Sequence, residues 1–106
     1  MGGKNINKKL DCILGPKAVV YYSNDDYEVV YPKDGKKFTL KELQDLVGGW
    51  IETATLNDGR IMVLNEEGKL MGFPRNNRAT QIYHDFMYKG DFIVGTAVVS
   101  DPELID

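Results

Sequence analysis

Two short segments rich in β-branched and aromatic residues lie near the start of the chain. Residues 18–22 (AVVYY) and 27–31 (YEVVY) have this composition, and the turn-forming residues 23–26 (SNDD) separate them. Valine and tyrosine favour extended backbone, whereas serine, asparagine and aspartate favour turns. The pattern therefore predicts an antiparallel β-hairpin.

A helix is predicted to begin after Thr39. Thr39 and Glu42 have the spacing of a capping box, in which each side chain pairs with a free backbone N–H group. Apolar residues then recur at helical spacing and predict a single buried face: Leu40, Leu43, Leu46 and Val47. Residues 48–49 (GG) tolerate positive φ, so we expect the helix to end there.

A second hairpin is predicted after this helix. Residues 50–56 and 60–64 are two largely apolar segments, and residues 57–59 (NDG) between them favour a tight turn. Another turn is expected at 65–68 (NEEG), and it is followed by a predicted short extended segment over 69–73.

The last third of the chain predicts a second helix and a buried strand. Asn76 or Asn77 can cap the helix, and apolar residues follow at helical spacing: Ala79, Ile82, Tyr83 and Phe86. Residues 92–99 (FIVGTAVV) are almost continuously apolar, which is typical of a central strand covered on both faces. Gly95 in this segment indicates a bulge or a close backbone approach.

Together these elements predict an α+β fold. Their order is β-β-α-β-β-α-β, which suits one sheet of about five strands with two helices packed on it. The length of 106 residues favours one domain, which we place at residues 10–100. Residues 1–9 are interpreted as a flexible N-terminal arm and residues 101–106 as a frayed acidic tail.

Composition narrows the range of functions. Thirteen basic and sixteen acidic residues leave a net charge of −3, which argues against general nucleic-acid binding. Cys12 is the only cysteine and His84 the only histidine, so the sequence predicts neither an internal disulfide nor a cysteine metal cluster. Cys12 is interpreted as a small buried hydrophobic residue, and His84 as a surface or packing residue. We expect no cofactor and no membrane span, and a cytoplasmic location.

Four segments are distinctive as sequence motifs: 47–52 (VGGWIE), 65–70 (NEEGKL), 74–76 (PRN) and 91–96 (DFIVGT). In this order they resemble the signature of a family of small bacterial, phage and plasmid proteins that is known only as a domain of unknown function. The resemblance extends over about residues 38–99, and the N-terminal arm and the helix around His84 depart from it. It implies the fold and a phage or mobile-element setting, with the host cytoplasm as the location, but it implies no activity.

The acidic turn is the first candidate site. Asn65, Glu66 and Glu67 place two carboxylates and an amide at the end of a hairpin, where they could hold a ligand or a cation. The alternative is ordinary turn chemistry with soluble side chains. Glu52 lies in the preceding strand, and a buried position would require an arginine partner, namely Arg60, Arg75 or Arg78. A structural ion pair is favoured there over a catalytic acid.

The start of the second helix is the next candidate. Arg75, Asn76 and Arg78 could bind an anion at a helix N-terminus, although an ordinary cap with surface arginines is the alternative. The sequence has no glycine-rich phosphate loop of the NTPase type. Trp50 is favoured as a core residue over a binding-surface aromatic.

Four tyrosines in the first hairpin form another candidate surface: Tyr21, Tyr22, Tyr27 and Tyr31. They could form an exposed interaction face or pair with one another across the two strands, and the sequence favours neither. The same hairpin, or the last strand, could pair across a two-fold axis in a homodimer.

The sequence leads to two functional hypotheses. The favoured one is a non-enzymatic binding module that sequesters a small anionic ligand or blocks a host protein such as a defence component. The alternative is a small hydrolase or nucleotide-processing enzyme with glutamate acid/base groups and arginine clamps. Its candidate residues are Glu52, Glu66, Glu67, Arg75 and Arg78.

Overall fold

The computed structural model describes residues 15–86 and 90–105. Its elements are β1 (Ala18–Tyr21), β2 (Tyr27–Val30), α2 (Leu40–Val47), β3 (Ile51–Thr55), β4 (Ile61–Asn65), α3 (Asn77–Phe86), β5 (Ala97–Ser100) and the 3-10 helix η1 (Pro102–Leu104). The predicted α+β class and the β-β-α-β-β-α-β order are confirmed. The predictions for the arm 1–9 and for Cys12 lie outside the described residues.

The described strands form one five-stranded sheet in the order β2-β1-β5-β4-β3, and all four pairings are antiparallel. The last strand is therefore central, and every residue of β5 is buried, as its apolar sequence predicts. It is shorter than the predicted segment 92–99, because Gly95 has a left-handed φ of +72° that interrupts the extended backbone. Before this break, Val94 forms only an isolated bridge with Arg75.

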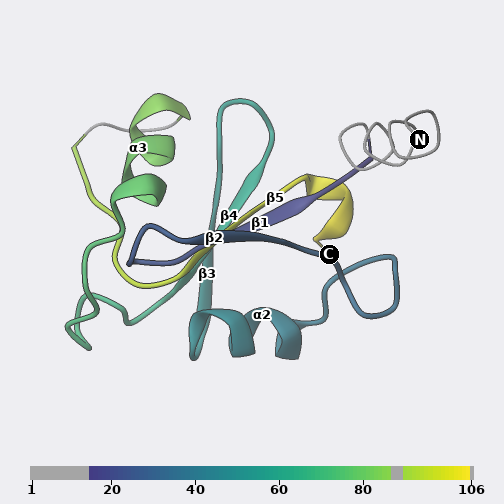
Figure 1. Cartoon of the computed structure of the whole chain (residues 1–106), viewed down its shortest axis with the longest axis horizontal. Helices are drawn as coiled ribbons and strands as arrows, with labels where there is room; N and C mark the ends of the chain where they lie inside the picture. The colour runs from purple at the N-terminus through teal and green to yellow at the C-terminus, as the bar shows by residue number, and fades with distance from the viewer. Residues whose placement is uncertain (1–14, 87–89, 106) are drawn as a thin grey trace, which may run out of the picture.

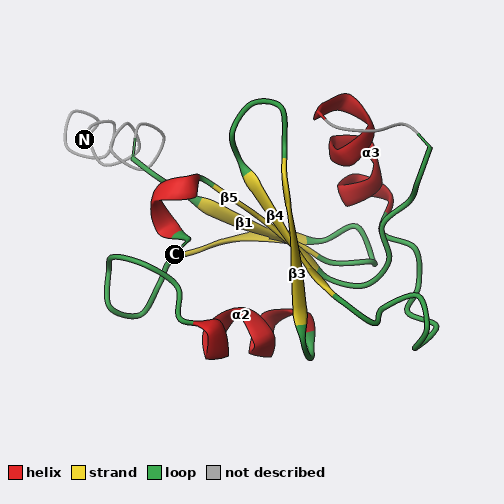
Figure 2. Ribbon diagram, turned by 180° about the vertical axis from the view of Figure 1, so that it is seen from behind, coloured by secondary structure: helices red, strands yellow, loops and turns green. Residues whose placement is uncertain are grey.

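Helices α2 and α3 cover opposite faces of the sheet (Figure 1). On one face, Leu43 and Val47 of α2 pack against Val63 and Val98. On the other face, α3 packs around Met62 and Val99, with its apolar side chains turned inward as predicted. Figure 2 shows the same three layers from behind, with the sheet between the red helices. Neighbouring residues of the inner strands thus contribute to different cores, as the two-residue repeat of a strand requires.

Helix α2 begins and ends where its sequence predicts. The Thr39 hydroxyl accepts a hydrogen bond from the Glu42 N–H at 3.1 Å, and the Glu42 carboxylate accepts one from the Thr39 N–H at 2.9 Å. Gly48 ends the helix at φ 86°. The prediction for Leu40 is wrong, because its side chain is 57% exposed. Leu40 is the first residue of the helix and lies at its solvent-facing end.

The segment predicted as extended over 69–73 is instead a compact turn. The Met71 N–H donates to the Glu67 carbonyl at 2.9 Å, and the Phe73 N–H donates to the Gly68 carbonyl at 3.0 Å. These contacts fold the chain back on itself after β4. Gly72, with a left-handed φ of +71°, makes such a reversal accessible, and this local hydrogen bonding outweighs the weak strand signal of the segment.

Residues 101–105 are ordered against the core, contrary to the frayed tail predicted from the sequence. The Asp101 carboxylate accepts a hydrogen bond from the Lys17 N–H at 2.9 Å, and the Leu104 carbonyl accepts one from the Phe38 N–H at 2.9 Å. Leu104 itself is buried in the α2-side core. The apolar side chain within the acidic tail therefore holds the end of the chain against the sheet. Among the described residues, no helix has the length and apolar character to cross a membrane.

Candidate functional site

A groove of about 290 Å³ opens on the α3 side of the sheet, beside the edge strand β3. Glu52 and Ala54 of β3 face this side, because they pair with Leu64 and Met62 of β4 and Met62 belongs to the α3-side core. Tyr83 of α3 lines the groove from the helix side. The remaining walls come from the turn after β4 and from residues 91–94.

Carboxylates outnumber basic groups along the groove. Glu52, Glu66 and Asp91 line it, and Lys69 is the basic residue among its lining residues. Lys69 already pairs with Asp91, with 2.5 Å between Nζ and Oδ1. Neither Glu52 nor Glu66 takes part in an ion pair within the described parts of the chain, and both are exposed. The groove thus offers two uncompensated negative charges.

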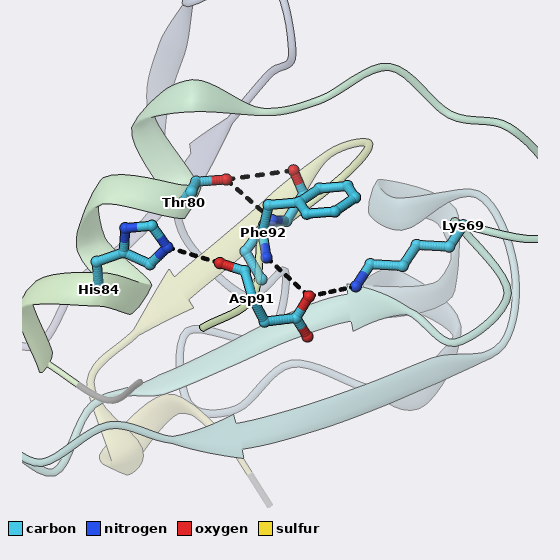
Figure 3. A network of polar contacts seen from close by, with 6 residues as sticks. Lys69, Thr80, His84, Asp91 and Phe92 are labelled. Carbon is cyan, nitrogen blue, oxygen red and sulfur yellow. Dashed lines mark hydrogen bonds and ion pairs between the residues drawn. The ribbon is translucent and has the colours of Figure 1, made fainter. Parts of the chain in front are cut away.

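Asp91 connects three walls of the groove (Figure 3). Its Oδ1 accepts a hydrogen bond from the Phe92 N–H at 2.8 Å as well as the contact from Lys69. Its backbone carbonyl lies 2.6 Å from His84 Nε2, so Nε2 must carry the proton that is donated. His84 is half-buried, and this contact joins α3 to the segment 91–94. The turn, the 91–94 segment and α3 are therefore held together at one residue.

The ion pair also changes the acidity of Asp91. The hydrogen bond from Lys69, followed by the one from the Phe92 N–H, lowers the pKa of the Asp91 carboxyl below its ordinary value. The Asp91 carboxylate therefore stays charged at more acidic pH than it does in the unfolded chain.

Two apolar side chains project from the groove into solvent. Leu70 is 88% exposed and Phe92 is 41% exposed, although both line the groove. Two cations lie near the Phe92 ring: Lys69 Nζ is 4.5 Å and Arg75 Cζ is 5.3 Å from its centroid. These contacts hold the ring in place. Exposed apolar side chains beside a charged groove are typical of a contact surface.

The two asparagines predicted at the site hold the backbone together. Asn76 is fully buried; its Nδ2 donates to the Tyr21 and Gly95 carbonyls at 2.8 Å each, and its Oδ1 accepts from the Ala79 N–H at 3.1 Å. Asn76 is thus the predicted cap of α3. Asn65 Nδ2 donates to the Val47 carbonyl at 3.2 Å, and its Oδ1 accepts from the Glu67 N–H at 2.7 Å.

The arginines do not gather at one place. The Arg78 guanidinium lies 5.3 Å from the Tyr27 ring, whereas Arg75 lies over Phe92, and neither lines the groove. Arg60 pairs with Asp58 at 2.6 Å, so it does not pair with Glu52. Glu52 is exposed and needs no buried partner.

The sequence prediction for Trp50 is wrong, because this side chain is 66% exposed. It lies beside a shallow surface formed with the last turn of α2. The φ of +159° at Gly49 is extended backbone that leads the chain out of the helix and places Trp50 outside both cores.

The tyrosines of the first hairpin divide between the two interpretations. Tyr27 and Tyr31 are exposed, whereas Tyr21 and Tyr22 are half-buried. The rings of Tyr21 and Tyr27 also form a cross-strand pair, with 6.3 Å between their centroids. The hairpin therefore has both an exposed aromatic surface and cross-strand packing.

Sequence reasoning missed Lys69, Asp91 and Phe92 as site residues. The one available signal was that they belong to the segments NEEGKL and DFIVGT, which carried the family resemblance. Their meeting depends on the folded turn after β4 and could not be derived from their spacing. Among the described residues, no group of three His, Cys, Asp or Glu side chains is arranged to hold a metal ion.

Comparison with known families supports the resemblance. Residues 16–103 match the family described as Domain of unknown function (DUF3846). The chain belongs to this family. The match includes α2, α3, the five described strands and every residue that lines the groove. No curated protein and no solved structure gives a significant match.

Proposed function

We propose that this DUF3846 protein is a non-enzymatic binding module whose groove receives a basic side chain of a protein partner. The observation that carries the proposal is the combination of two uncompensated carboxylates, Glu52 and Glu66, with the projecting side chains of Leu70 and Phe92. Lysine or arginine would complement the carboxylates, and the apolar part of its side chain would contact the apolar groove lining.

The charge of the groove favours a basic group over the small anionic ligand considered from the sequence. An anion would meet the charges of Glu52 and Glu66, while Lys69 is already paired with Asp91. The phage or mobile-element setting suggested by the sequence makes a host protein, including a defence component, the partner class that we propose. The host cytoplasm is the corresponding location.

The enzymatic alternative has one observation in its favour. Glu52 and Glu66 come from different elements and line the same groove, as paired acid/base carboxylates would. The arginine clamps of that hypothesis are not among the lining residues, so the binding function is better supported. Recovery of a bound partner unchanged supports the binding function, and its cleavage or modification supports the enzyme.

The test is removal of the two groove charges. The variant Glu52→Gln/Glu66→Gln keeps side-chain size, and Glu67→Gln is a matched control, because Glu67 is on the same turn but does not line the groove. Each of the two glutamates would form one exposed ion pair with the partner, worth about 0.2–1 kcal/mol. The double variant should therefore bind the partner about 2- to 30-fold more weakly. Fluorescence anisotropy with a labelled peptide of alternating lysine and threonine measures this. Equal affinity of the double variant and the control would refute the proposal.

A further inference from the structure

Within the described residues, strand β3 has an edge that pairs with no other strand, and this edge lies directly beside the groove. The Leu56 N–H donates to the Arg60 carbonyl and the Glu66 N–H donates to the Trp50 carbonyl, both at 2.8 Å, so residues 50 and 56 direct their backbone groups toward β4. These directions alternate along an antiparallel strand. Ile51, Thr53 and Thr55 therefore direct their N–H and C=O groups away from β4.

Nothing in residues 15–86 and 90–105 pairs with that edge. β3 is the terminal strand of the sheet order, and no side chain from the described segments hydrogen-bonds to residues 51–55. Natural edge strands are commonly protected by lysine, proline or a bulge. The sequence of β3, IETAT, contains no lysine or proline, and its pairing with β4 is continuous from Ile51 to Thr55.

The other edge of the sheet differs in charge. β2 is also terminal, but the carboxylate of its exposed Glu28 already accepts a hydrogen bond from Tyr22. Its exposed Tyr27 lies under the Arg78 guanidinium, so a basic segment would meet a positive charge there. At β3, the side chain of Glu52 lies on the groove side, and Glu66 lines the same groove. Charge complementarity therefore selects β3 for a basic partner.

We propose that β3 accepts an extended basic segment of a protein partner as a sixth strand of the sheet, an inference that rests on the proposed function. The backbone of the segment pairs with Ile51, Thr53 and Thr55. Its side chains alternate between the two faces, at about 7 Å between neighbours on one face. A lysine or arginine on the α3 side enters the groove between Glu52 and Glu66, while Leu70 and Phe92 contact the apolar part of the same segment.

The probe for this inference is an unlabelled peptide of alternating lysine and threonine, about ten residues long, which exceeds the length of β3. A peptide with glutamate in place of lysine is the matched control. Amide hydrogen exchange, followed by NMR on the full chain, reports the pairing directly. We expect exchange at Ile51, Thr53 and Thr55 to slow by about tenfold or more with the lysine peptide, because these amides acquire acceptors. The glutamate peptide should have no effect.

A pair of variants gives a second readout. Thr53→Pro removes an outward N–H that β4 does not use, and proline is tolerated at such edge positions. Thr53→Ala removes the side chain and keeps the N–H. We expect Thr53→Pro to lose most of the peptide affinity and Thr53→Ala to keep it. The exchange experiment on the unaltered protein decides the question even if the proline variant does not fold.

The other outcomes separate the two proposals. Binding that depends on Glu52 and Glu66 but leaves the β3 amides unchanged overturns strand addition and keeps the groove function. Slower exchange of the β2 amides instead of the β3 amides also overturns the inference. So does slower exchange of the β3 amides when the protein concentration is raised without peptide, and this result identifies a second copy of this chain as the occupant. Binding of the lysine peptide that ignores both carboxylates refutes the proposed function. A lysine peptide that does not bind overturns both.

Discussion

Replacing Gly95 by alanine should clearly lower the stability of the fold. Its φ of +72° lies in the left-handed region, and a Cβ built there would lie 2.7 Å from Cδ2 of Phe73 and 3.4 Å from its Cβ. Because the contact includes atoms close to the backbone of Phe73, a small movement of the ring tip does not relieve it. The Gly95→Ala variant therefore combines backbone strain with a steric clash.

The two effects can be estimated separately. A non-glycine residue in the left-handed region costs about 1–2 kcal/mol. Forcing an extra methyl into a packed contact costs about 1–3 kcal/mol more. The expected loss in the free energy of unfolding is about 2–5 kcal/mol, which for a domain of this size lowers Tm by at least about 8 °C.

Gly72 supplies a matched control. Its φ is +71°, almost the same as at Gly95, but a Cβ there meets nothing within 4 Å. Gly72→Ala should therefore lower the free energy of unfolding only by the cost of the strained backbone, about 1–2 kcal/mol. Urea unfolding of both variants, monitored by circular dichroism, measures the difference. Equal losses would refute the argument, since they would mean that the contact with Phe73 costs nothing.

Two further predictions concern polar residues. Asn76→Ala removes three hydrogen bonds of a fully buried side chain, each with a net value of about 0.5–1.5 kcal/mol, so chemical denaturation should show a loss of about 1.5–4.5 kcal/mol. Asn77→Ala, at an exposed position, should show a much smaller loss. An unchanged midpoint for Asn76→Ala would contradict its role. Asp91 has a lowered pKa in the folded state, so its stabilising effect is complete above about pH 4 and is lost as pH falls through the folded value. Asp91→Asn should therefore be less stable than the unaltered protein at pH 7, by no more than about 1 kcal/mol for this exposed pair, and the difference should shrink toward pH 3. If the difference in stability between Asp91→Asn and the unaltered protein grew on acidification, the pKa of Asp91 would not be lowered by folding.

Much of the local structure could be predicted from the sequence. The capping box of Thr39 and Glu42, the Asn76 cap and the turn between β3 and β4 involve residues within a few positions of one another. Their hydrogen bonds are available as soon as the local backbone forms, so short patterns are sufficient. The central position of β5 was also predictable, because only a strand covered on both faces can be apolar at almost every position.

The errors about side-chain burial have a common physical origin. Leu40, Trp50 and Leu104 were judged by side-chain type and nearby spacing, but their burial depends on which other elements lie over them. Leu104 is buried because η1 returns to the α2 side of the sheet, and Trp50 is exposed because nothing described covers the end of α2. A hydrophobic residue gains from burial only where a covering surface exists.

The sequence by itself determined the fold class, the order of elements, the helix caps and the net charge, because each follows from residue chemistry over short distances. Only the tertiary structure decided which strands lie on either side of β5, and with this order the groove. Glu52 and Asp91 come from parts of the chain that meet only after β5 inserts between β1 and β4 and the turn after β4 folds back. Such contacts depend on the closure of long loops and on sheet pairing, which no short sequence pattern records.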